Sequence, residues 1–223
     1  MNAPPRPRVQ VALDDAAAGA AVLALSTALA RELAFDLDVV YVESAASVSA
    51  AALPLAQVLP HAASGWQPLR PSDVEQGFRS HAERLRQLTG ELAARQALRW
   101  SLRVLRGSLA EVPTLLQGES ALLFVATAPP LGLTLPRSAA PGRRQPMVAL
   151  ACDHAAPAPE ALATATRLAR ALGGVVQLWT PGPQAGRWPA ALAGARPDVL
   201  VMPRRAVAAD ALVWLPCPLL LVG

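Results

Sequence analysis

Three pairs of adjacent charged or titratable residues each follow an apolar run in this chain. Their side chains are of the kinds that catalysis or ligand binding would require. The pairs are Asp14-Asp15, Asp153-His154 and Arg204-Arg205. Two carboxylates can share general acid and base roles, an aspartate beside a histidine can move a proton, and adjacent arginines can bind a carboxylate or a phosphate. For the two pairs that contain aspartate we favour simpler interpretations: an aspartate that caps the following helix, and a histidine that is solvated in a loop.

The residue types that metal and covalent chemistry need are scarce. The two cysteines, Cys152 and Cys217, form no CxxC pair, and the three histidines lie far apart, so we predict no metal site and two buried thiols without a bridge. The chain has no lysine, which excludes a Walker-type lysine and Schiff-base chemistry. Because no nucleophile, base and orienting group stand out as a set, we predict that the protein is not an enzyme.

The net charge is +4 and the isoelectric point about 10.3, values that can indicate nucleic-acid binding. All twenty basic residues are arginine, however, in a chain dominated by alanine, and the longest basic clusters are pairs. A GC-rich coding bias explains this pattern, so we expect no nucleic-acid partner. With 53% hydrophobic residues, no apolar segment of eighteen residues and no secretory signal, the sequence predicts a soluble cytoplasmic protein without membrane insertion.

The elements that must position the charged pairs alternate between strand and helix in the first half of the chain. We predict strands at Arg8–Leu13, Leu37–Glu43, Arg99–Arg106 and Ala121–Thr127. We predict helices at Ala17–Ala34, from Pro71 onward with a Ser72–Glu75 capping box, and after Gly107, with Pro113 inside the last one. The stretch Ser44–Pro71 is rich in proline and serine and is predicted to be a long insertion or lid-like loop.

The second half restarts the same pattern after a linker rich in proline, glycine and arginine, as VALDDAAAGAAVLAL against VALACDHAAPAPEAL shows. We predict strands at Met147–Cys152, Val175–Trp179, Asp198–Met202 and Cys217–Val222. We predict helices from Pro157–Glu160 to Gly173-Gly174, near Trp188–Ala195, and at Ala206–Val213. The repeat indicates two related halves.

The closing segment PDVLVMPRR…LPCPLLLVG, together with the strand–aspartate–helix–strand start of each half, resembles the universal stress protein family. The matching parts are a buried strand led by Asp198, the loop Pro203–Arg205, the helix Ala206–Val213, and Cys217-Pro218 before the final strand. The resemblance covers nearly the whole chain, as two degenerate tandem copies.

This resemblance implies an α/β fold of doubly wound parallel sheets, built from adenine nucleotide alpha hydrolase-like units with strand order 3-2-1-4-5. It implies a first unit at 1–128 with its insertion at 44–71, a linker at 129–146, and a shortened second unit at 147–223. Arg99–Arg106 would then be an edge strand. Since the first copy lacks a fifth strand of its own, we expect each half to complete the other's core. The two halves would replace or supplement the family's homodimer, and a protein partner is the other expected association.

Nucleotide-binding family members use an aspartate after strand 1, a valine in strand 2 and a glycine-rich loop after strand 4. The matching positions are Asp14 and Val42 in the first copy and Asp153 in the second. The loops depart from the pattern: Gly132 and Gly142 keep the spacing, but Pro129 and Arg143 replace the first glycine and the hydroxyl, and Pro203-Arg204-Arg205 replaces the second loop. Because proline supplies no amide to a phosphate, we predict no ATP binding in the family manner and no cofactor.

Arg204 and Arg205 should approach Asp153, because strands 1 and 4 are neighbours in this fold. Either the arginines neutralise Asp153 in an ion pair, which we favour, or they bind an anion in place of the lost loop. The candidate binding residues are therefore Asp14, Val42, Asp153, Arg204 and Arg205. The resemblance predicts a non-catalytic regulatory or interaction module of the stress-response type. The alternative is a nucleotide- or anion-binding sensor with an altered phosphate loop, and an enzyme is the least favoured interpretation.

Overall fold

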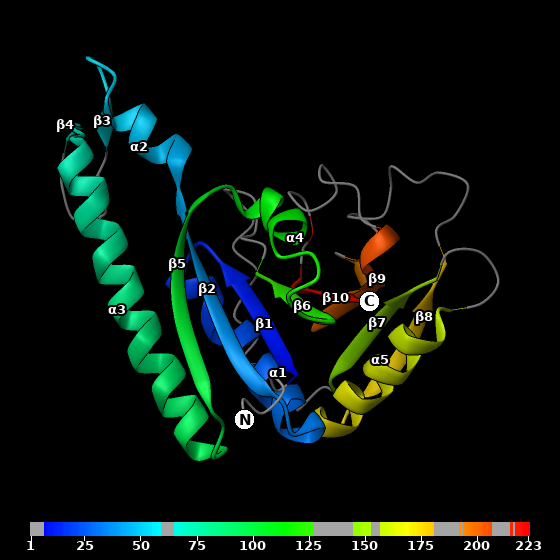
Figure 1. Ribbon diagram of the computed structural model, residues 1–223. Coiled ribbons are helices and arrows are strands. Elements are labelled where there is room, and N and C mark those ends of the chain that lie inside the picture. The colour runs from blue at the N-terminus through cyan, green and yellow to red at the C-terminus, as the bar shows by residue number, and fades with distance from the viewer. Residues whose placement is uncertain are drawn as a thin grey trace.

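The computed structural model describes residues 7–58, 65–126, 145–152, 157–180, 192, 194–206, 215 and 217–223. These residues form an α/β fold around one eight-stranded, mostly parallel sheet (Figure 1). Its strands, in chain order, are β1 (Arg8–Leu13), β2 (Asp36–Ser44), β5 (Trp100–Gly107), β6 (Leu122–Val125), β7 (Met147–Ala151), β8 (Val175–Trp179), β9 (Val199–Pro203) and β10 (Leu219–Val222).

The order of strands across the sheet is β5-β2-β1-β6-β10-β9-β7-β8. Neighbouring strands run parallel everywhere except between β6 and β10, where Leu122 stands opposite Val222 in an antiparallel pair. The sheet therefore consists of two parallel halves that run in opposite directions. As a result, the carboxyl ends of the strands in one half lie at the same edge as the amino ends of the strands in the other.

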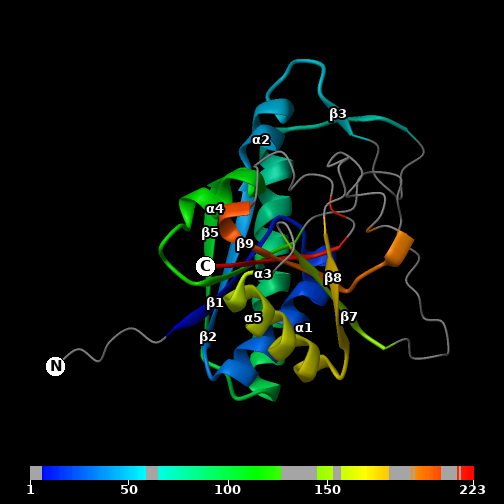
Figure 2. The same cartoon turned by 90° about the vertical axis from the view of Figure 1, so that its right-hand side faces the viewer.

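The central strands are apolar along their length because both of their faces are covered. Helices α1 (Ala16–Leu33), α3 (Pro71–Arg95) and α5 (Pro159–Leu172) pack on one face, around side chains such as Phe124. Figure 2 shows α1 and α5 side by side on this face. The opposite face is covered, among the described residues, by the 3-10 turn η1 (Leu109–Glu111), by α4 (Val112–Leu115), and by Leu192 and Leu215.

The expected half-buried strand at Arg99–Arg106 is confirmed as β5, which lies at one edge of the sheet with alternating exposure. Two of its arginines form ion pairs, on opposite faces of the sheet: Arg106 contacts Glu43 at 3.3 Å, and Arg103 contacts Asp38 at 3.3 Å. The opposite edge is β8, whose Val175 and Leu178 side chains are exposed. The edge of the sheet in the first half is therefore formed by its most polar strand, β5.

The segment Ser44–Pro71 was expected to be a loop, and this is wrong for much of it. It contains a helix, α2 (Ala45–Ala51), and a two-stranded hairpin of β3 (Gln57–Val58) and β4 (Gln67–Pro68) that extends beyond the sheet (Figure 1). Ser44 starts the helix because its side chain accepts a hydrogen bond from the backbone N–H of Ser47. Of the residues that suggested a loop, Ser44 caps the helix, Ser47 and Ser49 lie inside it, and Pro68 belongs to β4.

The start of α3 also differs from the expected Ser72–Glu75 capping box. Pro71 is the first helical residue, a position that suits its fixed φ and missing N–H, so the cap falls on Arg70. The Asp73 carboxylate accepts the backbone N–H of Arg70 at 3.1 Å. The capping interaction is therefore displaced by two residues toward the N-terminus.

The remaining boundaries shift by one or two residues at strand ends. Asp198 precedes β9 and accepts the backbone N–H of Met147 at 2.7 Å, so its carboxylate ties two neighbouring strands together. Cys152 and Cys217 are buried thiols and form no disulfide, as predicted, and β9 lies between the strands β7 and β10 that they flank. Most of the linker at 129–146, Asp153-His154, and most of the helices expected near Trp188–Ala195 and at Ala206–Val213 lie outside the described residues.

Candidate functional site

The arrangement of strands in the second half marks one place where a ligand would bind. The chain passes from β7 through α5 to β8 on one side, and later returns to β9 on the other side of β7. In open α/β sheets, ligands bind beyond the carboxyl ends of the strands at such a reversal. The turn η3 (Arg204–Ala206) follows β9 at this edge, so Arg204 and Arg205 stand at the expected position.

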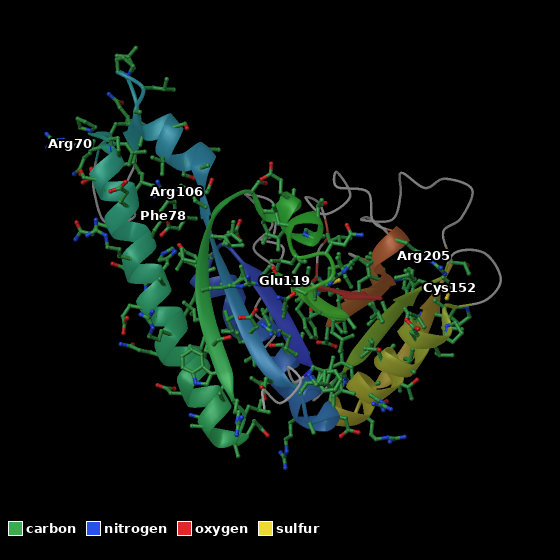
Figure 3. All side chains as sticks on the ribbon, in the orientation of Figure 1. Arg70, Phe78, Arg106, Glu119, Cys152 and Arg205 are labelled. Carbon is green, nitrogen blue, oxygen red and sulfur yellow. The ribbon has the colours of Figure 1, made fainter. Side chains whose placement is uncertain are left out.

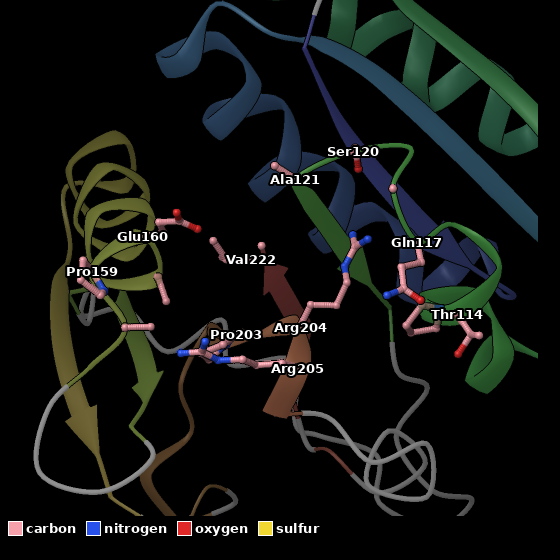
Figure 4. Close-up of a pocket in the computed structure, with 15 residues that line it drawn as sticks. Thr114, Gln117, Ser120, Ala121, Pro159, Glu160, Pro203, Arg204, Arg205 and Val222 are labelled. Carbon is pink, nitrogen blue, oxygen red and sulfur yellow. The ribbon is translucent and has the colours of Figure 1, made fainter.

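A cavity of about 850 Å³ opens at this edge of the sheet (Figure 4). Its walls come from four parts of the chain: the α4 region and the loop after it, the first turn of α5, the end of β9 and the end of β10. The polar and charged side chains that line it are those of Thr114, Gln117, Ser120, Glu160, Arg204 and Arg205. Small apolar residues, including Val222 at the end of β10, line the remainder.

Arg204 is the most constrained charged group in the cavity. Its Nη1 donates to the backbone carbonyl of Leu116 at 3.4 Å, while Nε and Nη2 are buried without a hydrogen-bond partner among the residues described. Burial lowers the pKa of the guanidinium, yet an arginine remains protonated at neutral pH. A partly buried cation with two unsatisfied donors is costly, and the negative charge of an anion in the cavity would offset that cost.

Two further charges face the same cavity. Arg205 is exposed and extends toward the start of α5, and Glu160 extends inward from the first turn of that helix (Figure 4). Within the described part of the chain, Glu160, Arg204 and Arg205 take part in none of the ion pairs, all of which lie in the first half. The cavity therefore presents charges of both signs that are available to a ligand.

The first turn of α5 adds backbone donors to this wall. Ala158 is the N-cap residue and gives no side-chain cap, and Pro159 follows it without an N–H. The N–H groups of Glu160 and Ala161 belong to the turn in which helical amides have no acceptor within the helix. These two donors, together with the positive end of the helix dipole, favour negative charge at the cavity.

The opposite wall of the cavity is held in place by a polar network on the sheet. Gln10, Asp38 and Ser101 stand in register across β1, β2 and β5. The Gln10 amide donates to Asp38 at 3.1 Å and to Glu119 at 3.0 Å, and Ser101 donates to Asp38 at 2.8 Å. The network thus runs from the edge strand to the loop after α4.

Two contacts complete this network. The hydroxyl of Ser120, which lines the cavity, donates to the side-chain carbonyl oxygen of Gln10 at 2.8 Å. Glu119, which Figure 3 labels, accepts from Arg103, and the Arg103 guanidinium lowers the pKa of that carboxyl. The loop therefore has a fixed position relative to Arg204, which donates to the carbonyl of Leu116 at its start.

The structure separates the residues that the sequence proposed as a binding site. Arg204 and Arg205 line the cavity, whereas Asp14 and Val42 do not. Asp14 follows β1 and Val42 lies in β2, and both strands run opposite to β9. Val42 is buried in the core. Burial raises the pKa of Asp14, whose Oδ1 has no partner among the described residues. Asp153 lies outside the described residues, so the ion pair expected with the arginines stays a prediction.

Sequence reasoning missed Glu160, Gln117 and Ser120, which also line the cavity. Glu160 follows a proline at a helix start, a common position for an acidic residue, and nothing in its spacing indicates a ligand. Gln117 and Ser120 come from the other half of the chain, and no motif connects them to Arg204. The polar network had a visible sign, because Gln10 and Asp38 interrupt otherwise apolar strands.

Comparison with known proteins gives no family for this chain: no family model and no curated protein matches it. Among the described residues, no helix is long and apolar enough to cross a membrane. The same residues contain no cluster of three or more His, Cys, Asp or Glu side chains that could hold a metal ion.

Proposed function

We propose that the protein is a regulatory module that senses a small anion, which it binds in the cavity at the ends of β9 and β10. The observation that carries this proposal is Arg204, a partly buried guanidinium whose Nε and Nη2 have no partner among the described residues and which lines an open cavity. Arg205 adds a second positive charge, and the first turn of α5 adds two backbone donors. This favours the anion-sensor alternative over an interaction module without a ligand.

The proposed organisation is that of two degenerate universal-stress-protein-like units at 1–128 and 147–223. Numbered in chain order, the strands of the first half stand in the order 3-2-1-4 and those described in the second half in the order 2-1-3-4. If the second unit lacks the family's third strand, its order becomes 2-1-4-5, and this supports the proposal. β10 pairs with β6, at the place where a fifth strand of the first unit would stand. One strand would then serve both halves, which would replace the family's dimer contact.

In this proposal ATP is not the ligand. Pro203 offers no amide to a phosphate, and Glu160 places a negative charge near the helix start where phosphates would bind. The proposed role is non-catalytic, because no hydroxyl among the described cavity-lining residues donates to a carboxylate that could activate it; Ser120 donates to the side-chain carbonyl of Gln10 instead.

The test is calorimetric titration with citrate, pyrophosphate and Mg-ATP at low and physiological salt. At least one small anion is expected to bind, and the Arg204→Gln variant should weaken that binding at least tenfold. Arg167→Gln removes the same charge from the exposed surface of α5 and should change the affinity little. Absence of anion binding, or equal affinity in Arg204→Gln, would overturn the proposal, and micromolar Mg-ATP binding would contradict its choice of ligand.

A further inference from the structure

The cavity has a chemical asymmetry that a simple anion would not use. The arginines belong to the β9 side, and Glu160 projects from α5 on the other side, with open space between them (Figure 4). Glu160 is exposed and makes no ion pair with the described arginines. A carboxylate that only stabilised the start of the helix could point into solvent. This one lines the same cavity as Arg204 and Arg205, neither of which forms an ion pair with a described residue.

This arrangement favours a ligand that carries both charges over an anion that carries only negative charge. Glu160 repels a negatively charged ligand, so it reduces the attraction that the arginines provide. Pro159 removes one of the amides that would otherwise bind a phosphate at the helix start. A ligand with a negative end toward Arg204 and a positive end toward Glu160 would instead satisfy both walls.

The rest of the lining indicates what lies between those ends. Ala121, Ala158, Ala161, Pro203 and Val222 give the cavity an apolar interior. Its volume of about 850 Å³ lies within the range of about 300–1,000 Å³ that is typical of small-molecule sites. A single amino acid carries its two charges on one carbon, whereas a dipeptide separates them by two extended residues, about 7 Å at most.

We propose that the cavity binds a zwitterionic, dipeptide-sized ligand with an apolar body, its carboxylate on Arg204 and Arg205 and its ammonium group on Glu160. This inference rests on the proposed anion site and names the class of ligand that the site takes. Gln117 and Ser120 supply polar groups on the wall beside Arg204, where they can bond to the peptide unit. Binding requires no covalent step and no metal.

The experiment uses three probes with the same apolar body. Leucyl-leucine carries both charges, N-acetyl-leucyl-leucine carries only the negative one, and leucyl-leucine amide carries only the positive one. Calorimetry at neutral pH and low salt should show that leucyl-leucine binds the wild-type protein at least tenfold more tightly than either of the other two.

Matched variants assign each charge to its wall. Glu160→Gln should weaken the binding of leucyl-leucine at least tenfold without weakening the binding of N-acetyl-leucyl-leucine. Arg204→Gln should weaken the binding of both peptides, and Arg167→Gln should weaken the binding of neither. Thermal unfolding of each variant shows whether it is folded; Glu160 is exposed, so Glu160→Gln leaves the fold intact.

The outcomes separate this inference from the proposal on which it rests. Equal binding of leucyl-leucine and its acetylated form, unchanged in Glu160→Gln, would overturn the zwitterion while the anion site stands. If neither peptide shows binding that depends on Arg204, but citrate or pyrophosphate does, the inference fails alone. If no probe and no anion binds, both fail.

Discussion

At the scale of single residues, Tyr41 shows how burial changes the pKa of a hydroxyl that has no partner among the described residues. Its side chain is fully buried, packs edge-to-face on Phe78 with ring centroids 6.4 Å apart, and has a hydroxyl without a partner among the described residues. Burial raises its pKa to about 12, and burial raises the pKa of Cys217 to about 12 as well. Both groups are neutral in the folded protein at neutral pH.

These shifts predict a loss of stability at alkaline pH. Because the folded pKa of each group exceeds its unfolded value of about 9 or 10, their contribution to the free energy of unfolding is intact below pH 9 and is lost as the pH rises toward 12. Tyr41→Phe should change stability at pH 7 by no more than about 1 kcal/mol and should lessen the alkaline decline. Urea unfolding at several pH values measures both. A loss above about 2 kcal/mol at pH 7 would show that the hydroxyl is paired.

At the scale of elements, we predict that alanine substitution changes the stability of the protein in opposite directions at two glycines. Gly174 connects α5 to β8, and a Cβ added there would stand 2.3 Å from the backbone carbonyl oxygen of Pro146. Gly174→Ala should therefore destabilise the protein by about 1–3 kcal/mol. Gly77 lies inside α3 with nothing within 4 Å of the added atom, so Gly77→Ala should stabilise by about 0.5–1 kcal/mol. Thermal denaturation of both variants measures these changes. If Gly174→Ala leaves the stability unchanged, the backbone of the turn between α5 and β8 moves enough to accommodate the added Cβ.

At the scale of the whole molecule, β10 joins the two halves of the sheet. It pairs with β6 on one side and β9 on the other, and its four residues are buried. Each of these side chains contributes about 1.5–3 kcal/mol on burial, while a whole domain is stable by only about 5–15 kcal/mol. Deletion of Cys217–Gly223 should therefore abolish the cooperative unfolding transition. Thermal unfolding monitored by circular dichroism measures this. A truncated protein that unfolds near the original temperature would show that the strand is peripheral.

Local sequence patterns predicted most elements because those patterns depend on neighbours along the chain. The apolar runs of β1, β6 and β10, the alternation in β5, and the glycine that ends α5 in a left-handed conformation each follow from residues within a few positions. The displaced cap at Arg70 and the structure inside 44–71 were missed, since several residues there could start a helix and only packing selects among them.

The sequence by itself determined the α/β class, the buried state of both cysteines and the position of Arg204 and Arg205 after a strand end. Only the tertiary structure decided what those arginines face. The antiparallel contact between β6 and β10 brings Ser120 and Gln117 beside Arg204 and leaves Asp14 outside the cavity. The direction in which two distant strands pair is set by the burial of their shared faces, a long-range term that no local pattern contains.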